Sequence, residues 1–328
     1  MELTTKIEIS SNELQIKHTD RVLLLGSCFA DNIGEKLSKG GFDCLHNPFG
    51  TLYNPASISA MLSQSVIDRR YTAEERELFR DERTGQWHSW MHHSMFSSAD
   101  REHLITQIND ATHLTSQRIK EAGLLIVTFG TSIIYRLKAD GMLVANCHKQ
   151  ADRMFVRERM SHHDIVDQWV ELLRQIHSIN PKMKVIMTVS PIRHKRDGLH
   201  VNQLSKAVLL LAVDDIVGRC TDDGQDKWVQ YFPSYEIMMD ELRDYRYYAD
   251  DMVHPSPLAV EYIWERFADT YFTADTKSII RQCNDICRAL SHRPSDPESE
   301  SYRKFIDATN DKIDALKEKY PYLCISKR

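Results

Sequence analysis

The chain has 328 residues, of which 42% are hydrophobic and 27% charged, and its formal net charge is −5. This composition is ordinary for a globular protein with a sizeable core, and the acidic balance argues against nucleic acid as a partner. No apolar run approaches the length of a membrane span, so we expect no membrane association. The N-terminus lacks the pattern of a signal peptide and the seven cysteines are scattered, which predicts a cytoplasmic location.

Strand-like and helix-like segments alternate along most of the chain. The expected strands are short apolar runs at residues 21–27, 42–46, 124–129, 183–189 and 228–232. Segments with helical apolar spacing lie at residues 30–39, 56–67, 161–179, 199–217 and 257–267. This alternation indicates an α/β fold, with a doubly wound, mostly parallel sheet of five strands.

Two parts of the chain depart from this alternation. Residues 68–120 have no clean strand period and are rich in charge, and we interpret them as a helical insertion in a domain that spans residues 1–275. Residues 276–328 are expected to form a C-terminal helical extension, in which a polar linker precedes an amphipathic helix that ends near Tyr320. That helix docks onto the domain or contacts a second copy, so we expect a monomer or a weak dimer.

The most informative segment is residues 21–30, in which four apolar residues lead into Gly26 and then into two nucleophiles, Ser27 and Cys28. A buried strand that turns at glycine into a helix places the turn at the carboxyl edge of a parallel sheet, where ligands collect. The helix N-terminus is expected to lower the pKa of the Cys28 thiol below the ~8.5 of a free thiol. The alternative is an ordinary tight turn with a buried cysteine.

A second motif lies far downstream, where Asp251 precedes His254 by three residues in a segment that contains Pro255 and Pro257. This spacing lets the carboxylate fix the tautomer of the imidazole while the other ring nitrogen faces a nucleophile. Asp250 does not have this spacing, and we expect it to be more exposed.

The run Gly26–Ala30 resembles the signature of the GSCFA-domain family, which is similar to a branch of the SGNH/GDSL hydrolases. The resemblance covers most of residues 1–275. It implies an acyl-ester hydrolase or acyltransferase that works through an acyl-enzyme, with His254 as the base and Asp251 orienting it. The nucleophilic serine of GDSL enzymes follows the glycine by two positions, which is Cys28 here. We therefore favour Cys28 as the nucleophile and keep Ser27 as the alternative.

The same resemblance implies an oxyanion hole, formed by the amide of the nucleophile, a glycine after the second strand and an asparagine after the third. Cys28 and Gly50 match the first two by position. The third block carries Thr131 and Ser132 where the asparagine is expected, so a hydroxyl from one of them, or the side chain of Asn47, would have to donate. Helix capping is an equal alternative for the two hydroxyls.

Residues 86–94 contain three histidines and two tryptophans. His88 and His92 could hold a metal if they lay on one helix, but no acidic or cysteine ligand is suitably spaced, so we assign no metal and no cofactor. The segment is also typical of a sugar-binding cleft or of an aromatic lid packed on the sheet edge. Arg193 follows the strand at 183–189 and is expected to anchor an anionic or polar substrate group.

The sequence thus predicts an enzyme that acts on a small-molecule or carbohydrate ester. The alternative is a non-catalytic carbohydrate- or ligand-binding module that kept the fold, because the asparagine of the third block is absent.

Overall fold

The computed structural model describes residues 4–9, 14–221, 227–294, 296 and 298–327. A five-stranded sheet lies at its centre, with the strand order β11-β10-β6-β1-β2, and each neighbouring pair of strands is parallel. These strands are β1 (Val22–Gly26), β2 (Cys44–His46), β6 (Leu124–Phe129), β10 (Lys184–Val189) and β11 (Val229–Tyr231). The predicted α/β fold with a five-stranded, doubly wound sheet is confirmed, and this sheet is parallel throughout.

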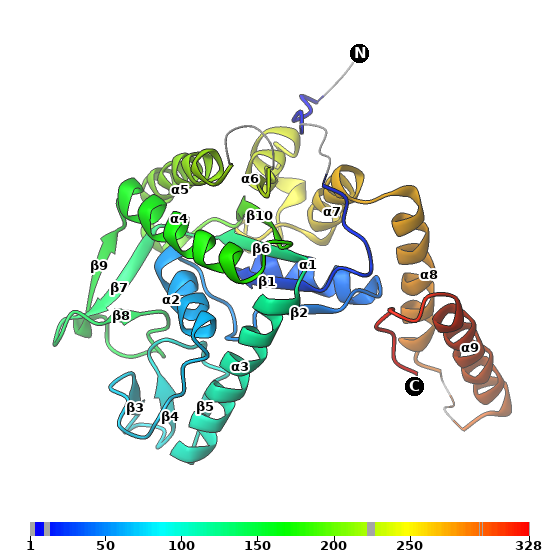
Figure 1. Ribbon diagram of the computed structural model, residues 1–328, viewed down its shortest axis with the longest axis horizontal. Coiled ribbons are helices and arrows are strands. Elements are labelled where there is room, and N and C mark those ends of the chain that lie inside the picture. Colours follow the sequence, from blue (N-terminus) through cyan, green and yellow to red (C-terminus); the bar gives the residue numbers. More distant parts are fainter. Residues whose placement is uncertain (1–3, 10–13, 222–226, 295, 297, 328) are drawn as a thin grey trace.

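Helices cover both faces of the sheet (Figure 1). They are α2 (Pro55–Val66), α4 (His162–Ile179) and α5 (Leu199–Cys220) on one face, and α1 (Cys28–Lys39) and α7 (Pro257–Tyr271) on the other. Successive residues of β1 point to opposite faces, so Leu23 and Leu25 join the first core while Val22 and Leu24 join the second. Because both faces are buried, the strands are continuous apolar runs, which makes them visible in the sequence.

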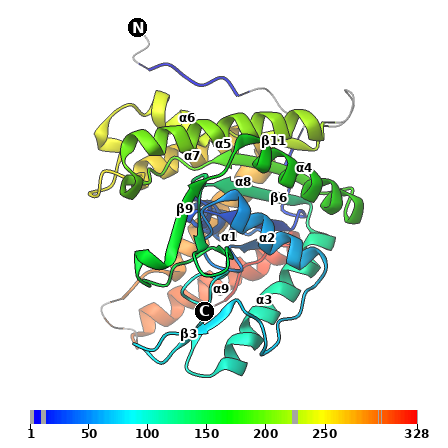
Figure 2. The same cartoon turned by 90° about the vertical axis from the view of Figure 1, so that its left-hand side faces the viewer.

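Two small antiparallel sheets are additions that the sequence did not predict. The insertion holds β3 (Leu78–Arg80), β4 (Trp87–Ser89) and β5 (Ser97–Ser98) together with the helix α3 (Arg101–Glu121). The other sheet is formed by β7 (Ile133–Leu137), β8 (Leu143–Val144) and β9 (Phe155–Arg159). Both views place β3 and α3 on the same side of the molecule, below the central sheet (Figures 1 and 2).

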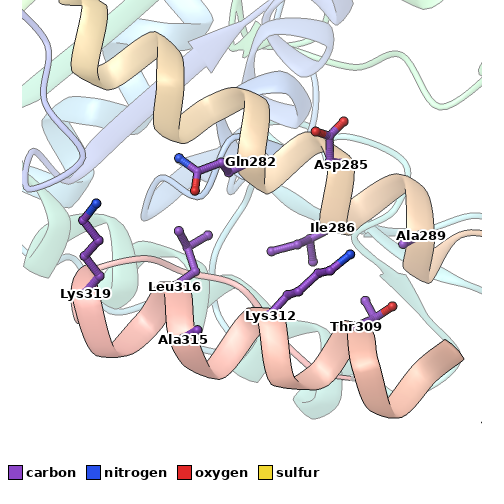
Figure 3. A pocket seen from close by; sticks show the side chains of 9 residues that line it. All are labelled: Gln282, Asp285, Ile286, Ala289, Thr309, Lys312, Ala315, Leu316 and Lys319. Atoms are coloured by element: carbon purple, nitrogen blue, oxygen red, sulfur yellow. The ribbon is translucent and has the colours of Figure 1, made fainter. Parts of the chain in front are cut away.

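The C-terminal part consists of α8 (Ala274–Leu290), α9 (Glu300–Lys319) and the segment that follows. It contacts the main domain at Gly41, whose carbonyl oxygen accepts a hydrogen bond from the Cys324 amide at 3.0 Å. A hollow of about 390 Å³ lies between α8 and α9. All of the side chains that line it come from these two helices (Figure 3). None of the described helices is both long enough and apolar enough to cross a membrane.

The histidine-rich segment forms part of an aromatic cluster in the insertion. His88 lies on β4 and His92 in the turn after it, so the helical spacing that a two-histidine metal site requires does not form. His92 is fully buried against the rings of Phe49, Tyr71 and Phe96, and its Nδ1 is 2.8 Å from the Ser89 hydroxyl. Burial lowers the pKa of His92 to about 3.

This burial predicts a loss of stability in acid. Between pH 6.5 and 3 the unfolded chain binds a proton at residue 92 that the folded chain does not bind. The contribution is therefore complete above pH 6.5 and is lost as the pH falls, by about 3 kcal/mol near pH ~4.5. We expect His92→Gln to flatten the pH dependence of the unfolding free energy, measured by urea denaturation, and the exposed His103→Gln to leave it unchanged. Equal slopes in all three proteins would contradict this account.

Candidate active site

The turn that carries Cys28 is built around Gly26, the last residue of β1. Its φ is +146°, and a Cβ at this position would lie 2.3 Å from the Thr128 carbonyl oxygen on the neighbouring strand. Only glycine fits so close to β6. Ser27 then caps α1 by accepting a hydrogen bond from the Phe29 amide at 3.3 Å, and Cys28 is the first residue of that helix.

The second element of the site is the loop before α7. The loop is held in place by a bridge between Tyr248 and Pro255 and by Ser256, whose side chain caps α7. It brings His254 to Cys28 across 226 residues of sequence, with 3.8 Å between the thiol Sγ and Nε2 of the ring. The two motifs found in the sequence therefore meet in space.

Asp251 fixes the orientation of His254. One carboxylate oxygen, Oδ2, lies 2.5 Å from Nδ1 of the ring, and the other accepts hydrogen bonds from the backbone amides of Val253 and His254 at 2.9 Å each. These bonds, led by the His254 amide, lower the pKa of Asp251 to about 2. An ionised carboxylate only accepts, so in the neutral ring Nδ1 carries the proton and Nε2 offers its lone pair to the thiol. Asp250 is exposed.

The structure distinguishes the two candidate nucleophiles by their contacts. Ser27 is 1% exposed, and its hydroxyl caps α1. Cys28 is partly exposed and is the one of the two that contacts His254.

The expectation that the thiol has a lowered pKa is wrong for this conformation. Burial is the largest effect and raises the pKa of Cys28 above the usual value of a thiol. The amides of Cys28 and Phe29 at the helix N-terminus and the charge of Lys206 lower the pKa but do not outweigh burial, and Asp31 raises it further. Cys28 therefore rests as a neutral thiol.

Lys206 is a residue of the site that the sequence analysis missed. It lies on α5, is 1% exposed, and its ammonium group donates to the carbonyl oxygens of Gly130 and Ser190 at 2.6 Å each. These carbonyls follow β6 and β10, so Lys206 joins two strand ends beside the nucleophile. Burial lowers the pKa of Lys206 to about 7, and Cys28 acts in the opposite direction. The available signal was a set of polar residues at helical spacing, Asn202, Ser205 and Lys206, in the first turns of α5.

The expected oxyanion donors are largely occupied. The Gly50 amide donates to the Asn47 carbonyl at 2.8 Å, and the Asn47 side chain holds the Gly26 amide at 2.8 Å and Asp31 at 2.6 Å. The hydroxyls of Thr131 and Ser132 lie 3.0 and 3.1 Å from the Ser205 hydroxyl, and their hydrogen bonds hold the turn against α5.

Two further side chains border the site. The rings of Tyr53 and His194 pack edge to face with centroids 5.8 Å apart. A Cβ built on Gly130 would lie 3.2 Å from Nε2 of His194 and 3.4 Å from the Cβ of Ser27, so His194 approaches the same turn. Burial lowers the pKa of His194 to about 4, which keeps this ring neutral near pH 7.

Arg193 reaches the site from the other side. Its amide lies 3.5 Å from the carbonyl of Val253, next to the catalytic histidine candidate, and its guanidinium donates to the Tyr248 hydroxyl at 3.2 Å. Among the described residues, no group of three or more histidine, cysteine or acidic side chains is placed to hold a metal ion.

Two family models match this chain. The GSCFA family matches residues 21–267, and the C-terminal domain of GSCFA domain proteins matches residues 283–328. The chain belongs to the GSCFA family. The five residues Gly26–Ala30 of this GSCFA protein thus form the turn that carries the thiol.

Comparisons with curated proteins and with solved structures add little to the family assignment. The sequence has no match among curated proteins. Among solved structures, the GSCFA protein is similar to an acetyl xylan esterase, Est2A, from the rumen bacterium Butyrivibrio proteoclasticus, with 11% sequence identity and a TM-score of 0.32. The match covers 76% of this chain and 63% of the esterase, which is less than two thirds of that protein.

The raised pKa of Cys28 predicts how fast the thiol is alkylated at different pH values. Because burial raises the pKa of Cys28, the thiol is mostly protonated near pH ~7. We expect the rate of carbamidomethylation of Cys28 by iodoacetamide to rise about tenfold per pH unit from pH ~7 to ~9, measured by mass spectrometry of its peptide. Lys206→Met removes a nearby charge and should slow the reaction most near pH ~7, because Lys206, with a pKa of about 7, loses its charge as the pH rises further. A rate that is already constant near pH ~7 would indicate a thiolate–imidazolium pair and contradict this account.

Proposed function

We propose that this GSCFA protein hydrolyses or transfers an acyl group through a thioester on Cys28. The observation that carries the proposal is the chain of contacts from the Cys28 thiol to His254 and on to the Asp251 carboxylate. A nucleophile, a base at the nucleophile and a carboxylate that orients the base are the three parts that acyl transfer requires.

In the first half of the reaction, Sγ of Cys28 attacks the carbonyl carbon of the ester while its proton passes to Nε2 of His254. This attack gives a tetrahedral intermediate, in which the former carbonyl oxygen carries a negative charge. When this intermediate collapses, the carbon–oxygen bond to the alcohol breaks and His254 returns the proton to the leaving oxygen. Asp251 stabilises the imidazolium in between.

In the second half, an acceptor hydroxyl attacks the thioester and gives its proton to His254. Water as the acceptor makes the protein an esterase, whereas a sugar hydroxyl makes it an acyltransferase. Cys28 leaves as the thiol after His254 returns the proton.

The amide of Cys28 and the charge of Lys206 are our candidates for stabilising the oxyanion. The amide is at the first position of α1, where a backbone N–H has no partner within its own helix. Lys206 is buried within electrostatic reach of Cys28, so its charge is weakly screened by solvent. Gly50, Asn47, Thr131 and Ser132 could serve only if their present hydrogen bonds are exchanged.

An O-acylated carbohydrate is the substrate class that we propose. The tyrosine and histidine rings beside the thiol suit stacking and hydrogen bonding with a sugar. A cytoplasmic location, a monomer or weak dimer, and the absence of nucleic-acid and membrane partners stay predictions.

A second candidate is a ligand-binding module without turnover. The occupied state of the expected oxyanion donors favours it, because a site without such donors stabilises the transition state poorly. Under this hypothesis the chain binds acylated sugars but does not acylate Cys28.

Variants of the two neighbouring nucleophiles test the proposal. We expect Cys28→Ala to abolish release of acid from acetylated sugars and short-chain thioesters, and Cys28→Ser to keep a trace, since a hydroxyl attacks less readily at neutral pH. Ser27→Ala removes a helix cap, which costs about 1 kcal/mol of stability but leaves the thiol in place. An inactive Ser27→Ala protein beside an active Cys28→Ala protein would make Ser27 the nucleophile. A wild type that binds these esters and never turns them over would establish the binding module.

The neighbouring aspartates provide a matched pair for the orienting role. We expect Asp251→Asn to reduce kcat by about a hundredfold or more, because an amide does not fix the ring in the same tautomer. Asp250→Asn should change kcat less than about twofold, and thermal unfolding should confirm that both variants fold. Similar losses in both variants would mean that Asp251 does not have a distinct role.

A further inference from the structure

A pocket of about 240 Å³ lies beside the loop that carries His254. One wall is the turn after β10, and the other is the segment that follows the short helix α6 (Ser234–Glu236). This segment contains a π-helical turn at Ile237–Glu241 and a further turn at Tyr245–Tyr247. The lining of the pocket combines apolar sulfur, guanidinium and phenol groups, from Met238, Met239, Arg193, Arg243, Tyr245 and Tyr248.

The pocket shares its backbone with the loop of His254. Arg193 contacts this loop through the Val253 carbonyl, and Tyr248 forms a β-bridge with Pro255. The next residue, Ala249, donates a hydrogen bond to the His254 carbonyl at 2.8 Å. A ligand in the pocket therefore lies on the histidine side of the nucleophile.

The charges of the pocket are unbalanced. Arg193 donates to the Tyr248 hydroxyl and lies 5.2 Å from the centre of that ring. Neither Arg193 nor Arg243 has an ion-pair partner in the part of the chain that the structure describes. The one acidic residue of the lining, Asp244, is paired with Arg246 at 3.0 Å. Among the described residues, the hydroxyl proton of Tyr248 faces only the weak acceptor Sδ of Met239 at 3.9 Å, so a stronger acceptor could take it.

We infer that this pocket is a subsite for an anionic group, a carboxylate or a phosphate, on the alcohol part of the ester. The inference rests on the proposed function, because His254 must face the leaving oxygen in order to protonate it, and this places the pocket on the alcohol side. The planar fork of Arg193 suits a two-oxygen anion, and the Tyr248 hydroxyl adds a third donor. This subsite narrows the proposed substrate class to O-acylated sugars that carry an acidic group.

Two acetyl esters that differ in one charge test the subsite. The probes are para-acetoxybenzoate and its methyl ester, and the variants are Arg193→Gln, Arg193→Lys and the matched control Arg281→Gln, which removes an exposed arginine of α8 that does not line the pocket. We expect Arg193→Gln to lower kcat/KM for the anionic ester about tenfold or more, through KM, and to change kcat/KM for the methyl ester less than about threefold. Arg193→Lys should give an intermediate kcat/KM for the anionic ester because it keeps the charge, and Arg281→Gln should match the wild type. An equal loss for both esters in Arg193→Gln would overturn the subsite while leaving the acyl-transfer function in place.

A binding measurement separates the two proposals. If the wild type cleaves neither ester, the proposed activity fails for these probes, and the subsite is tested by calorimetric titration of para-hydroxybenzoate and its methyl ester. Tighter binding of the anion by the wild type, lost in Arg193→Gln and kept in Arg281→Gln, would support the subsite. Equal binding of the two compounds, or no binding of either, would overturn it.

Discussion

The close approach of β1 to β6 at Gly26 is the constraint on which the site depends. The strand ends with a φ of +146°, at a point where any side chain would collide with the Thr128 carbonyl. This conformation lets the chain leave the sheet and start α1 at once, so that the thiol stands at the carboxyl edge with the helix N-terminus behind it. A larger residue at position 26 would move β1, the cap at Ser27 and the thiol together.

His254, the partner of the thiol, is 226 residues away in the sequence. The fold brings the two side chains together. The loop of His254 is fastened by its own bridge and by the cap of α7, so its position does not depend on the thiol. Two independently fixed elements therefore meet at 3.8 Å, and this separation leaves room for the ring and the thiol to approach when a substrate enters.

The electrostatic environment of the site keeps the thiol neutral at rest and stabilises a negative charge that forms during the reaction. The thiol is neutral because burial raises its pKa, and the imidazole is held as an acceptor by an ionised Asp251. Lys206 is anchored by two carbonyls next to the same turn. A buried cation with no carboxylate bonded to it among the described residues gains most when a negative charge appears nearby, which is the state that acyl transfer passes through.

The sequence predicted the central fold and the contact between the Cys28 turn and the His254 loop. Both predictions rest on patterns within short segments of the chain. Strands buried on two faces leave apolar runs, and three-residue spacing sets Asp251 against His254. Strands of two or three residues, such as β5 and β8, are too short to show a period. Lys206 could not be placed because its contact with Gly130 spans 76 residues. The pKa of the thiol was misjudged because burial is a property of the folded chain and here outweighs the helix N-terminus.

The most direct test of the account is to look for the acyl-enzyme itself. The protein would be mixed with an activated acetyl ester, quenched in acid within the first turnovers, and examined by mass spectrometry of its peptides. We predict one acetyl group on Cys28, removed by neutral hydroxylamine as a thioester is, and a much smaller amount in His254→Ala. An acetyl group on Ser27, or none on either residue while ester is consumed, would contradict the account.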